Sequence, residues 1–453
     1  MGPLKALISA MLLLCCRPAV ALDPPEGGRS DKSVVHYGID PELGIESRSF
    51  SPELVSGLYE RLSGRKSSGL IGQGGSGLPS RGRVKILVLL VEFDEYPARP
   101  GETAEAVQSR IFGSGGSFPF ESLSAFYRRS SRGALEIEGN VLGWYKAGRR
   151  ADVPQTRAGR EELIKKALLS FKGHDFSQYD NNGDGAIDYF AVVWTGPSGD
   201  WATFWWGAAP QFSDKAFSVG GKTLGSYSWQ GVAEDWADPS SDFRITTLIH
   251  ETGHSLGLPD YYDYKPGVGP DGGLGYFDMM DSKHYDHNCF SKMMLGWVEP
   301  RVVNYDGEFS LAAAAMSGEC LMVVPPGAPG GRFGEFFLVE NRRRAGNDAD
   351  PRDIGEGLVI WHVDARLNSA GNDFLFNNQD TEHKLLRAME ADGSERIEKG
   401  PSRQFTRTSF YSAGRELGPG TAPSSAFYGG GVTGLTLTSV SDGQQASFRI
   451  SFR

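Results

Sequence analysis

Runs of hydrophobic residues predict where the strands and helices of this chain lie. Residues 84–93 form a continuous apolar run bounded by turn residues, which is the pattern of a buried strand. Similar patterns predict helices over 122–132 and 160–171 and strands over 135–141, 187–195 and 222–229. Later, short strand patterns alternate with turns over 309–311, 321–324, 336–340, 357–364, 435–437 and 446–452. We therefore expect an α+β fold whose C-terminal region, residues 301–453, is β-rich.

A further helix is predicted around residues 245–256, and its two sides differ in character. At about 100° per residue, His254 lies about 40° from His250 on a helical wheel. The residues on the other side are apolar or carry a methyl group: Ile245, Leu248, Ile249, Thr252 and Leu256. One side can pack on a core while the histidines face a cleft. We expect Ser241 or Asp242 to cap the N-terminus, and Gly257 to follow the C-terminal end with positive φ.

The residue types on this helix indicate a zinc-hydrolase site. His250 and His254 lie one turn apart, so their imidazoles can bind one ion, and Glu251 can reach a metal-activated water as a general base. Asp260, three residues beyond Gly257, can return as the third ligand and leave a fourth position for water. The HExxH pattern also occurs by chance on ordinary amphipathic helices, but the added Gly257, Asp260 and a downstream methionine segment favour the metal site.

The identity of the third ligand has an alternative at this stage. His284 and His287 follow closely in the sequence, and either imidazole could take the third position. Asp260 would then only cap the turn after Pro259, a common role for aspartate. Tyr285 could hydrogen-bond an oxyanion, although a surface position is the simpler expectation for Tyr285 and for both of these histidines.

Several segments together resemble a known family. His250–Asp263, Gly275–Met280 and Lys292–Trp297 look like the immune inhibitor A family of secreted metallopeptidases, which are similar to metzincins. Further resembling segments extend the likeness over most of 84–453: 126–127, 131–133, 144–145, 340–342 and 360–364. The resemblance implies a metzincin-like zinc-peptidase catalytic domain over 84–300, protein or peptide substrates, and Met280 as the methionine turn beneath the metal. The third ligand departs from the usual metzincin histidine, and Asp260 fits the family variant.

Composition and charge narrow the classes of partner. The chain has 453 residues, enough for two or three domains, and 39% of them are hydrophobic. A formal net charge of −10 argues against nucleic acid or an anionic membrane surface as the main partner. No segment after the N-terminus is long and apolar enough to be a transmembrane candidate.

The N-terminal sequence predicts export. Residues 1–21 combine Lys5, an apolar run and a small-residue cleavage motif at 19–21, the features of a secretory signal peptide. Residues 22–83 are polar, and 63–82 are dense in glycine and serine. The resemblance suggests a propeptide there, and a disordered leader is the alternative. Since 22–83 contains no cysteine, zymogen latency would need an aspartate from this set: Asp23, Asp31 or Asp40.

A second candidate metal site lies before the predicted strand 187–195. Oxygen ligands recur at alternate positions with a glycine at the bend: Asp180, Asn182, Asp184 and Asp188. This pattern is typical of loops that bind calcium or another hard cation. A strand rather than a helix follows, so the loop is not an EF-hand. The alternative is an Asx-rich turn that caps the strand.

Two cysteines and an aromatic cluster carry weaker predictions. Cys289 and Cys320 form an even pair in the mature, exported chain, which predicts one disulfide, with two buried free thiols as the alternative. The residues Trp201, Phe204, Trp205 and Trp206 could line a substrate subsite, but packing is the commoner role of such clusters. Strand 222–229 could be an edge to which an extended peptide adds.

Two classes of function remain from the sequence, besides zinc hydrolysis of a non-peptide amide. The first is a secreted zinc endopeptidase with Glu251 as general base and His250, His254 and Asp260 as zinc ligands. The second is a non-catalytic, calcium-stabilised binding or adhesion protein on the same fold. A missing ligand or base would indicate the second class, and here every one is present.

Overall fold

The computed structural model describes most of the chain from residue 49 onward. The described ranges are 49–62, 77–201, 203–238, 240–241, 243–263, 269–330, 334–379, 381–400 and 402–453. The predicted signal peptide, the three latency aspartates and most of the glycine-rich stretch lie outside them. No helix within the described ranges is long and apolar enough to cross a membrane.

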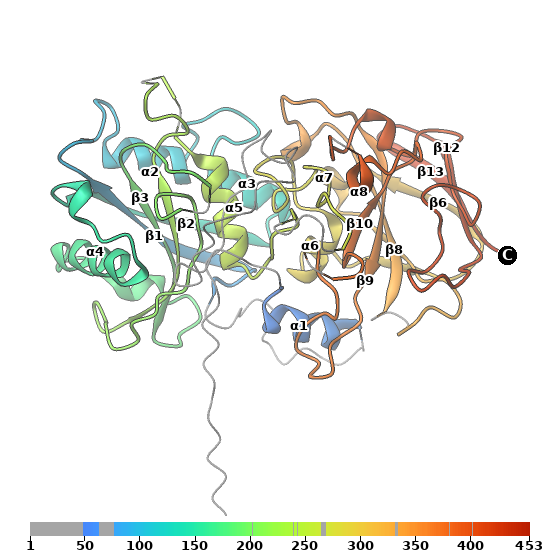
Figure 1. Ribbon diagram of the computed structural model, residues 1–453, viewed down its shortest axis with the longest axis horizontal. Coiled ribbons are helices and arrows are strands. Elements are labelled where there is room, and N and C mark those ends of the chain that lie inside the picture. The colour runs from blue at the N-terminus through green and yellow to red at the C-terminus, as the bar shows by residue number, and fades with distance from the viewer. Residues whose placement is uncertain are drawn as a thin grey trace, which may run out of the picture.

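The first half of the molecule is built on a four-stranded sheet in which all neighbouring strands run parallel. Its order is β2 (Leu135–Lys146), β1 (Gly82–Glu92), β3 (Ala186–Trp194) and β4 (Thr223–Gly231). The helices of this half are α2 (Ala104–Phe112), α3 (Leu123–Ser130), α4 (Arg157–Ser170), α5 (Ile245–Ser255) and α6 (Cys289–Met294). Figure 1 shows this sheet on the left, with α4 outermost and α5 towards the middle of the molecule.

Strand β1 is apolar throughout because both of its faces are covered. Ile86 and Val88 point into the core that contains α3 and α5, whereas Leu87 and Leu89 point into a second core that contains α4. A parallel strand covered on both faces needs apolar residues at successive positions. The continuous apolar run in the sequence therefore predicted this strand correctly.

The C-terminal half contains two further sheets, which Figure 1 shows on the right. One has the order β10 (Leu386–Met389), β9 (Gly357–Asp364), β8 (Glu335–Arg342), β7 (Leu321–Val323) and β5 (Arg301–Val303). The other has the order β11 (Glu416–Leu417), β12 (Leu435–Ser441), β13 (Gln445–Phe452) and β6 (Gly307–Ala312), with antiparallel neighbours throughout. Short helices α7 (Ala314–Ser317) and α8 (Arg396–Lys399) lie between strands. The expected β-rich region is confirmed.

The five-stranded sheet lies between the first half of the molecule and the four-stranded antiparallel sheet. Along β8, Phe337 and Val339 face the core shared with the antiparallel sheet, whereas Phe336 and Leu338 belong to the core that also contains the zinc-candidate helix α5. Strand β9 alternates in the same way, with Trp361 on the α5 side. A single core therefore crosses residue 300, and the β-rich region completes the half that carries α5.

Part of the expected leader is also built into this core. Helix α1 (Pro52–Leu62) buries Leu54, Val55 and Leu58 and packs against α6. Figure 1 shows α1 next to the junction of the two halves. The composition of 22–83 gave no sign of this helix, whose apolar residues number only a few.

Three weaker expectations are corrected by the structure. Arg244 occupies the N-cap of α5, and its side chain makes no capping hydrogen bond but donates to Glu234 and Ser198. Ser241 therefore does not cap the helix, and Asp242 lies outside the described residues. Cys289 and Cys320 are buried free thiols, so the alternative to the predicted disulfide is what the structure has. The edge of β4 is bridged by residues 208–212, with Ala208 paired to Trp229, and this part of it is closed to an added strand.

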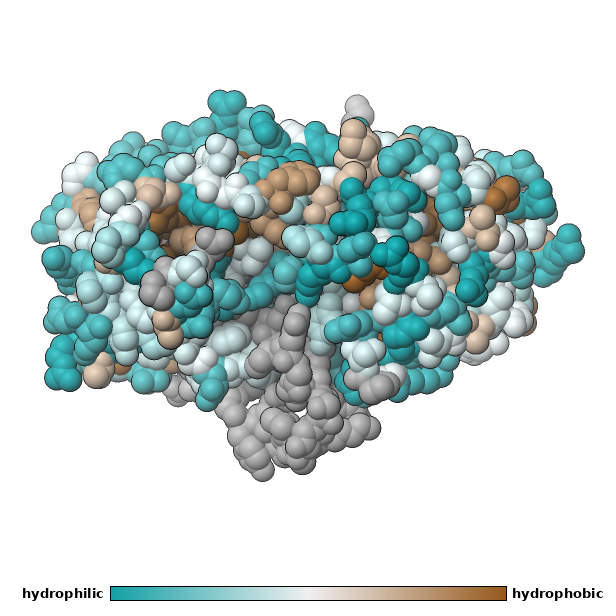
Figure 2. Space-filling model, turned by 90° about the horizontal axis from the view of Figure 1, so that it is seen from above, coloured by the Kyte–Doolittle hydropathy of each residue, from teal (hydrophilic) through white to brown (hydrophobic). Residues whose placement is uncertain are grey.

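The aromatic cluster serves packing. Phe204 and Trp205 are buried in the second core, and the guanidinium of Arg150 lies 4.0 Å above the Trp205 ring. Their packing favours the structural interpretation over a substrate subsite. The surface seen in Figure 2 is mostly hydrophilic, with apolar residues in separate small patches.

We expect a chain that ends at residue 300 not to fold. Such a chain loses more than ten buried apolar side chains of the shared core, including Phe336 and Trp361. Each contributes about 1.5–3 kcal/mol when buried, so their sum exceeds the roughly 5–15 kcal/mol that stabilises a domain. Circular dichroism of the truncated and full chains during heating is the measurement. A cooperative transition in the truncated chain would show that the two halves fold independently.

Candidate metal centre

Helix α5 ends in a geometry that turns the chain back towards its own histidines. The Gly257 N–H donates to the His254 carbonyl at 2.9 Å, and the Leu258 N–H donates to the Gly253 carbonyl at 3.1 Å. These two bonds make a Schellman ending, which requires positive φ at the residue after the cap. Gly257 has φ of 97°, as the sequence predicted.

The three expected zinc ligands converge. His250 Nε2 lies 3.1 Å from His254 Nε2 and 3.0 Å from Oδ1 of Asp260, and the His254–Asp260 separation is 3.3 Å. Zinc bonds of about 2.0–2.2 Å in a tetrahedral arrangement place ligand atoms about 3.3 Å apart. The side chains of all three residues are buried. Their spacing and chemistry fit a zinc ion.

Backbone carbonyls determine which imidazole nitrogen faces the centre. His250 Nδ1 lies 2.7 Å from the Met279 carbonyl, and His254 Nδ1 lies 2.9 Å from the Leu258 carbonyl. A carbonyl only accepts, so each Nδ1 carries the proton and donates. Each Nε2 therefore presents its lone pair towards Asp260. Such partners orient ligating histidines and raise their basicity.

The charges at the centre suit a cation. Burial lowers the pKa of His254, against the opposing effect of the Asp260 carboxylate. Burial alone would raise the pKa of Asp260, but the imidazoles of His254 and His250 outweigh it and hold that pKa below its usual value. The structure thus favours neutral His254 beside an ionised carboxylate, the protonation state that zinc ligands need.

Met280, for which the resemblance implies a methionine turn, packs against α5 at Gly253. A Cβ added at Gly253 would come within 2.4 Å of the Met280 sulfur, so a larger residue there would have to displace the Met280 side chain. The turn is held by Asp278, whose carboxylate accepts from the Met280 N–H at 2.7 Å. The Met280 carbonyl accepts from the Tyr261 N–H at 2.9 Å. The turn that carries Met280 therefore contacts both α5 and the segment after Asp260.

Glu251 lies between the two histidines in sequence and is fully buried. Burial raises the pKa of Tyr127 and of Tyr189, and the nearby Glu251 carboxylate adds to both effects. Both tyrosines also anchor α5, because Tyr127 donates to the Ile249 carbonyl at 2.7 Å and Tyr189 lies 3.2 Å from the Thr252 hydroxyl. Glu251 thus sits on a helix whose position is fixed from two sides.

The alternative third ligands are not part of the cluster. His284 pairs with Asp350 at 2.9 Å, and His287 packs among the rings of Phe126 and Tyr127. Burial lowers the pKa of His287 to about 3, so it is uncharged at neutral pH. Tyr285 is buried as well, so the surface expectation was wrong for His287 and Tyr285.

Sequence reasoning gave no role to two residues at the centre. Gly253 is the variable position directly before the second histidine of the HExxH motif, and its close contact with Met280 accounts for the absence of a side chain. Tyr262 stacks on His250 with ring centroids 6.4 Å apart. Its place two residues after Asp260 was the available signal, since residues beside a ligand tend to face the same centre.

The second cluster of acidic residues also forms. Carboxylate oxygens of Asp180, Asp184 and Asp188 lie within 4.8 Å of one another. Asn182 instead accepts from the Asp184 N–H at 2.9 Å, as an Asx turn does, and Lys222 lies 2.6 Å from Asp180. Burial raises the pKa of Asp188 to about 7, with the charges of Asp184 and Asp180 adding to the effect. The loop therefore combines turn bonds with a crowded negative charge.

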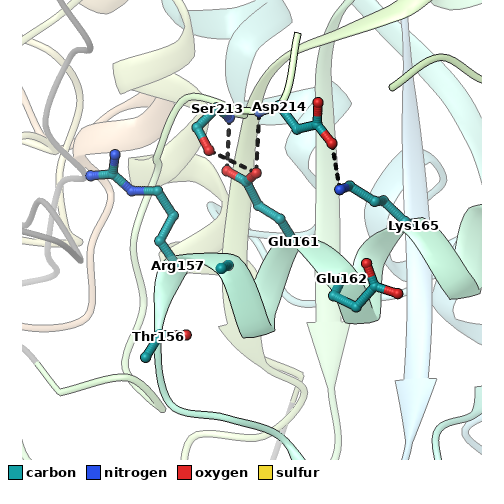
Figure 3. Close-up of a pocket in the computed structure, with 8 residues that line it drawn as sticks. Thr156, Arg157, Glu161, Glu162, Lys165, Ser213 and Asp214 are labelled. Atoms are coloured by element: carbon teal, nitrogen blue, oxygen red, sulfur yellow. Dashed lines mark hydrogen bonds and ion pairs between the residues drawn. The ribbon is translucent and has the colours of Figure 1, made fainter. Parts of the chain in front are cut away.

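A large open pocket is lined by residues of neither cluster. Figure 3 shows it beside α4, where buried Glu161 accepts from the backbone and hydroxyl of Ser213, and Lys165 pairs with Asp214 at 2.5 Å. The pocket measures about 920 Å³. Helix α4 packs in the second core, on the other face of the sheet from α5. This pocket is therefore separate from the metal centre.

Comparison with known proteins gives matches that cover part of the chain. No protein-family model matches the chain. Over 233 residues, 40% of the chain, it is 28% identical to Immune inhibitor A of Bacillus thuringiensis subsp. alesti, covering 33% of that protein. Over 196 residues, 36% of the chain, it is 26% identical to Pre-pro-metalloprotease PrtV of Vibrio cholerae serotype O1 strain M66-2, covering 21% of it. The match spans a third or less of these curated relatives, and it supports a metallopeptidase relationship over part of the chain.

Proposed function

We propose that this protein is a secreted, immune inhibitor A-like zinc metalloendopeptidase with a metzincin-like catalytic half. The observation that carries the proposal is the convergence of His250, His254 and Asp260 to within 3.3 Å beside Glu251. Protein or peptide substrates are proposed because one similar protein is named a metalloprotease. Secretion rests on the signal-like residues 1–21.

The residues of the site divide the work of peptide hydrolysis. When bound, zinc would supply Lewis acidity to the attacking water and to the scissile carbonyl. His250, His254 and Asp260 would hold it. The Glu251 carboxylate takes a proton from the attacking water and returns it to the leaving amine. The Met279 and Leu258 carbonyls keep both imidazoles in the tautomer that this arrangement needs.

A non-catalytic binding protein explains the site less well. Such a protein has no need of a glutamate beside two histidines, a carboxylate third ligand and a methionine turn in one buried cluster. Hydrolysis of a non-peptide amide would use the same residues, and the similarity to a named metalloprotease favours peptides.

We further propose that the loop of Asp180, Asn182, Asp184 and Asp188 binds calcium or another hard cation. Oδ1 of Asp180 and Oδ1 of Asp188 are buried and have no hydrogen-bond partner among the described residues. Unpaired buried carboxylate oxygens are costly, and a cation would relieve that cost. Lys222 supplies one positive charge to Oδ2 of Asp180, which leaves both Oδ1 atoms for an ion.

Glu251→Gln tests the base. The amide keeps the shape of the side chain but cannot accept a proton, so we expect turnover of a peptide substrate to fall by about 10² or more. Zinc content should stay at the wild-type level because the ligands are unchanged. The measurement is peptide cleavage by zinc-loaded protein, with and without 1,10-phenanthroline. Near-normal turnover in the zinc-loaded variant would remove Glu251 from this role.

Asp260→Ala tests the third ligand. We expect it to lose zinc during dialysis against a weak chelator, because one of three protein ligands is gone. His284→Ala and His287→Ala are the matched controls and should keep zinc, since neither imidazole reaches the cluster. Metal content by mass spectrometry is the measurement. Full zinc in Asp260→Ala together with loss in a histidine variant would reverse the assignment.

Calcium should raise the melting temperature of the protein, and EGTA should lower it reversibly. Asp188→Asn should abolish the calcium-dependent shift in melting temperature. The amide removes the negative charge of Asp188, one of the two aspartates whose Oδ1 atom is buried without a hydrogen-bond partner. Asp152→Asn, at an exposed residue, is the control and should keep the shift. Thermal unfolding at pH 8, where Asp188 is ionised, is the measurement. A melting temperature that ignores calcium in the wild type would reject the site.

A further inference from the structure

The third ligand sits on a segment with no regular structure of its own. Residues 258–263 are in neither helix nor strand, yet Asp260 and Tyr261 are about 1% exposed. The Tyr261 N–H bond to the Met280 carbonyl is one backbone restraint on this segment. A carboxylate that must stand about 2.0–2.2 Å from zinc needs tighter control than one such bond gives.

Gln379 supplies a restraint from the C-terminal half. Its side-chain amide donates to the Asp260 backbone carbonyl at 3.1 Å, and Gln379 is itself 1% exposed. The two residues are 119 positions apart in sequence. A buried side-chain donor on a ligand's own peptide group limits how far that ligand can rotate or shift.

An aromatic cluster holds the neighbouring residue. Phe50 contacts Tyr261 with ring centroids 6.3 Å apart and lies edge-on to Phe290 and Phe374 at 5.6 Å each. The Tyr261 hydroxyl lies 2.8 Å from the Ser291 hydroxyl. Phe374 begins the same C-terminal segment that carries Gln379. Residues from the expected leader, from α6 and from the C-terminal half thus meet in one cluster around Tyr261, the neighbour of Asp260.

The leader also completes the end of the ligand helix. The Ser51 N–H donates to the Gly257 carbonyl at 2.9 Å, and the Leu78 N–H donates to the Ser255 carbonyl at 3.0 Å. Carbonyls in the last turn of a helix have no partner within it, so the bond to Ser255 satisfies a group that would otherwise need water. The bond to Gly257 holds the residue that follows the cap. Residues 49–51 therefore act on both the helix end and the ligand segment.

We propose that Gln379 is a positioning residue for the Asp260 ligand, and that Phe50 shares this role through Tyr261. In the full chain, residues 50–51 and 374–379 then support the candidate metal centre. The inference rests on the proposed function, in which Asp260 binds zinc. The Gln379–Asp260 hydrogen bond and the Phe50–Tyr261 contact would position the Asp260 ligand and leave His250 and His254 unchanged.

Gln379→Met tests the inference in the full chain. Methionine has a similar volume but no N–H donor, so the core stays filled while the bond to Asp260 is lost. We expect zinc to leave about 10-fold faster in the presence of a chromophoric chelator, as for other residues that support a metal ligand. Leu375→Ala, at a half-exposed position of the same segment, is the matched control and should release zinc at the wild-type rate. Phe50→Leu should act in the same direction as Gln379→Met.

Two further measurements separate the possible outcomes. The metal-free Gln379→Met protein should be less stable than the metal-free wild type, because the buried Asp260 carbonyl loses a donor. Leu437→Ala, in the core of the distant antiparallel sheet, is the control for stability loss alone and should release zinc more slowly than Gln379→Met. Wild-type zinc release in Gln379→Met, or equally fast release in Leu437→Ala, would overturn the positioning role. Asp260→Ala is the reference: if it keeps zinc fully, the proposed ligand set fails, whereas loss there with retention in Gln379→Met defeats only this inference.

Discussion

The structure depends on keeping one carboxylate charge buried beside two neutral imidazoles. Asp260 has lost nearly all contact with solvent, and an isolated buried carboxylate would take up a proton instead of staying charged. The Nε2 atoms of the two imidazoles stand 3.0 and 3.3 Å from its oxygen. Neutral imidazoles that turn their Nε2 lone pairs towards a carboxylate do not compensate its negative charge. A divalent cation at the point where the three atoms converge would compensate it and accept all three lone pairs, which is why this cluster is a better candidate metal site than a structural ion pair.

The local part of this arrangement could be predicted from sequence, and the remote part could not. The histidine spacing, Gly257 and Asp260 all lie within eleven residues, so helical geometry and turn preferences determine how they meet. The apolar runs also predicted strands β1, β8 and β9, because strands covered on both faces need apolar residues throughout. Gln379 carries no such signal: a lone glutamine 119 residues from its partner looks like any surface amide.

Other mismatches have the same physical origin. Helix α1 was predicted to be part of a leader because 22–83 is polar overall. Its few apolar residues pack against α6, a contact that the sequence of the leader does not indicate. The cap of α5 was placed on a polar residue by local preference, but Arg244 occupies it, with its backbone N–H bonded to the Val232 carbonyl. The disulfide was predicted from the even number of cysteines alone, which says nothing about the distance between the two sulfur atoms. In each case tertiary contacts outweighed a local rule.

A buried ionic network between the two halves fixes the positions of groups near the candidate metal centre more than it stabilises the fold. Arg342 on β8 is 2% exposed, pairs with Asp348, and donates to the Asp286 carbonyl at 3.1 Å. Removing charges from water costs about as much as such pairs return, so the network adds little net stability. Its geometry has a clearer consequence. The guanidinium lies 4.5 Å above Phe277, at the start of the methionine turn, and Lys292 fixes the Asp286 carboxylate at 2.6 Å. Since the Met279 carbonyl in that turn sets the tautomer of His250, strand β8 affects the candidate metal centre through the position of its charge as well as through packing.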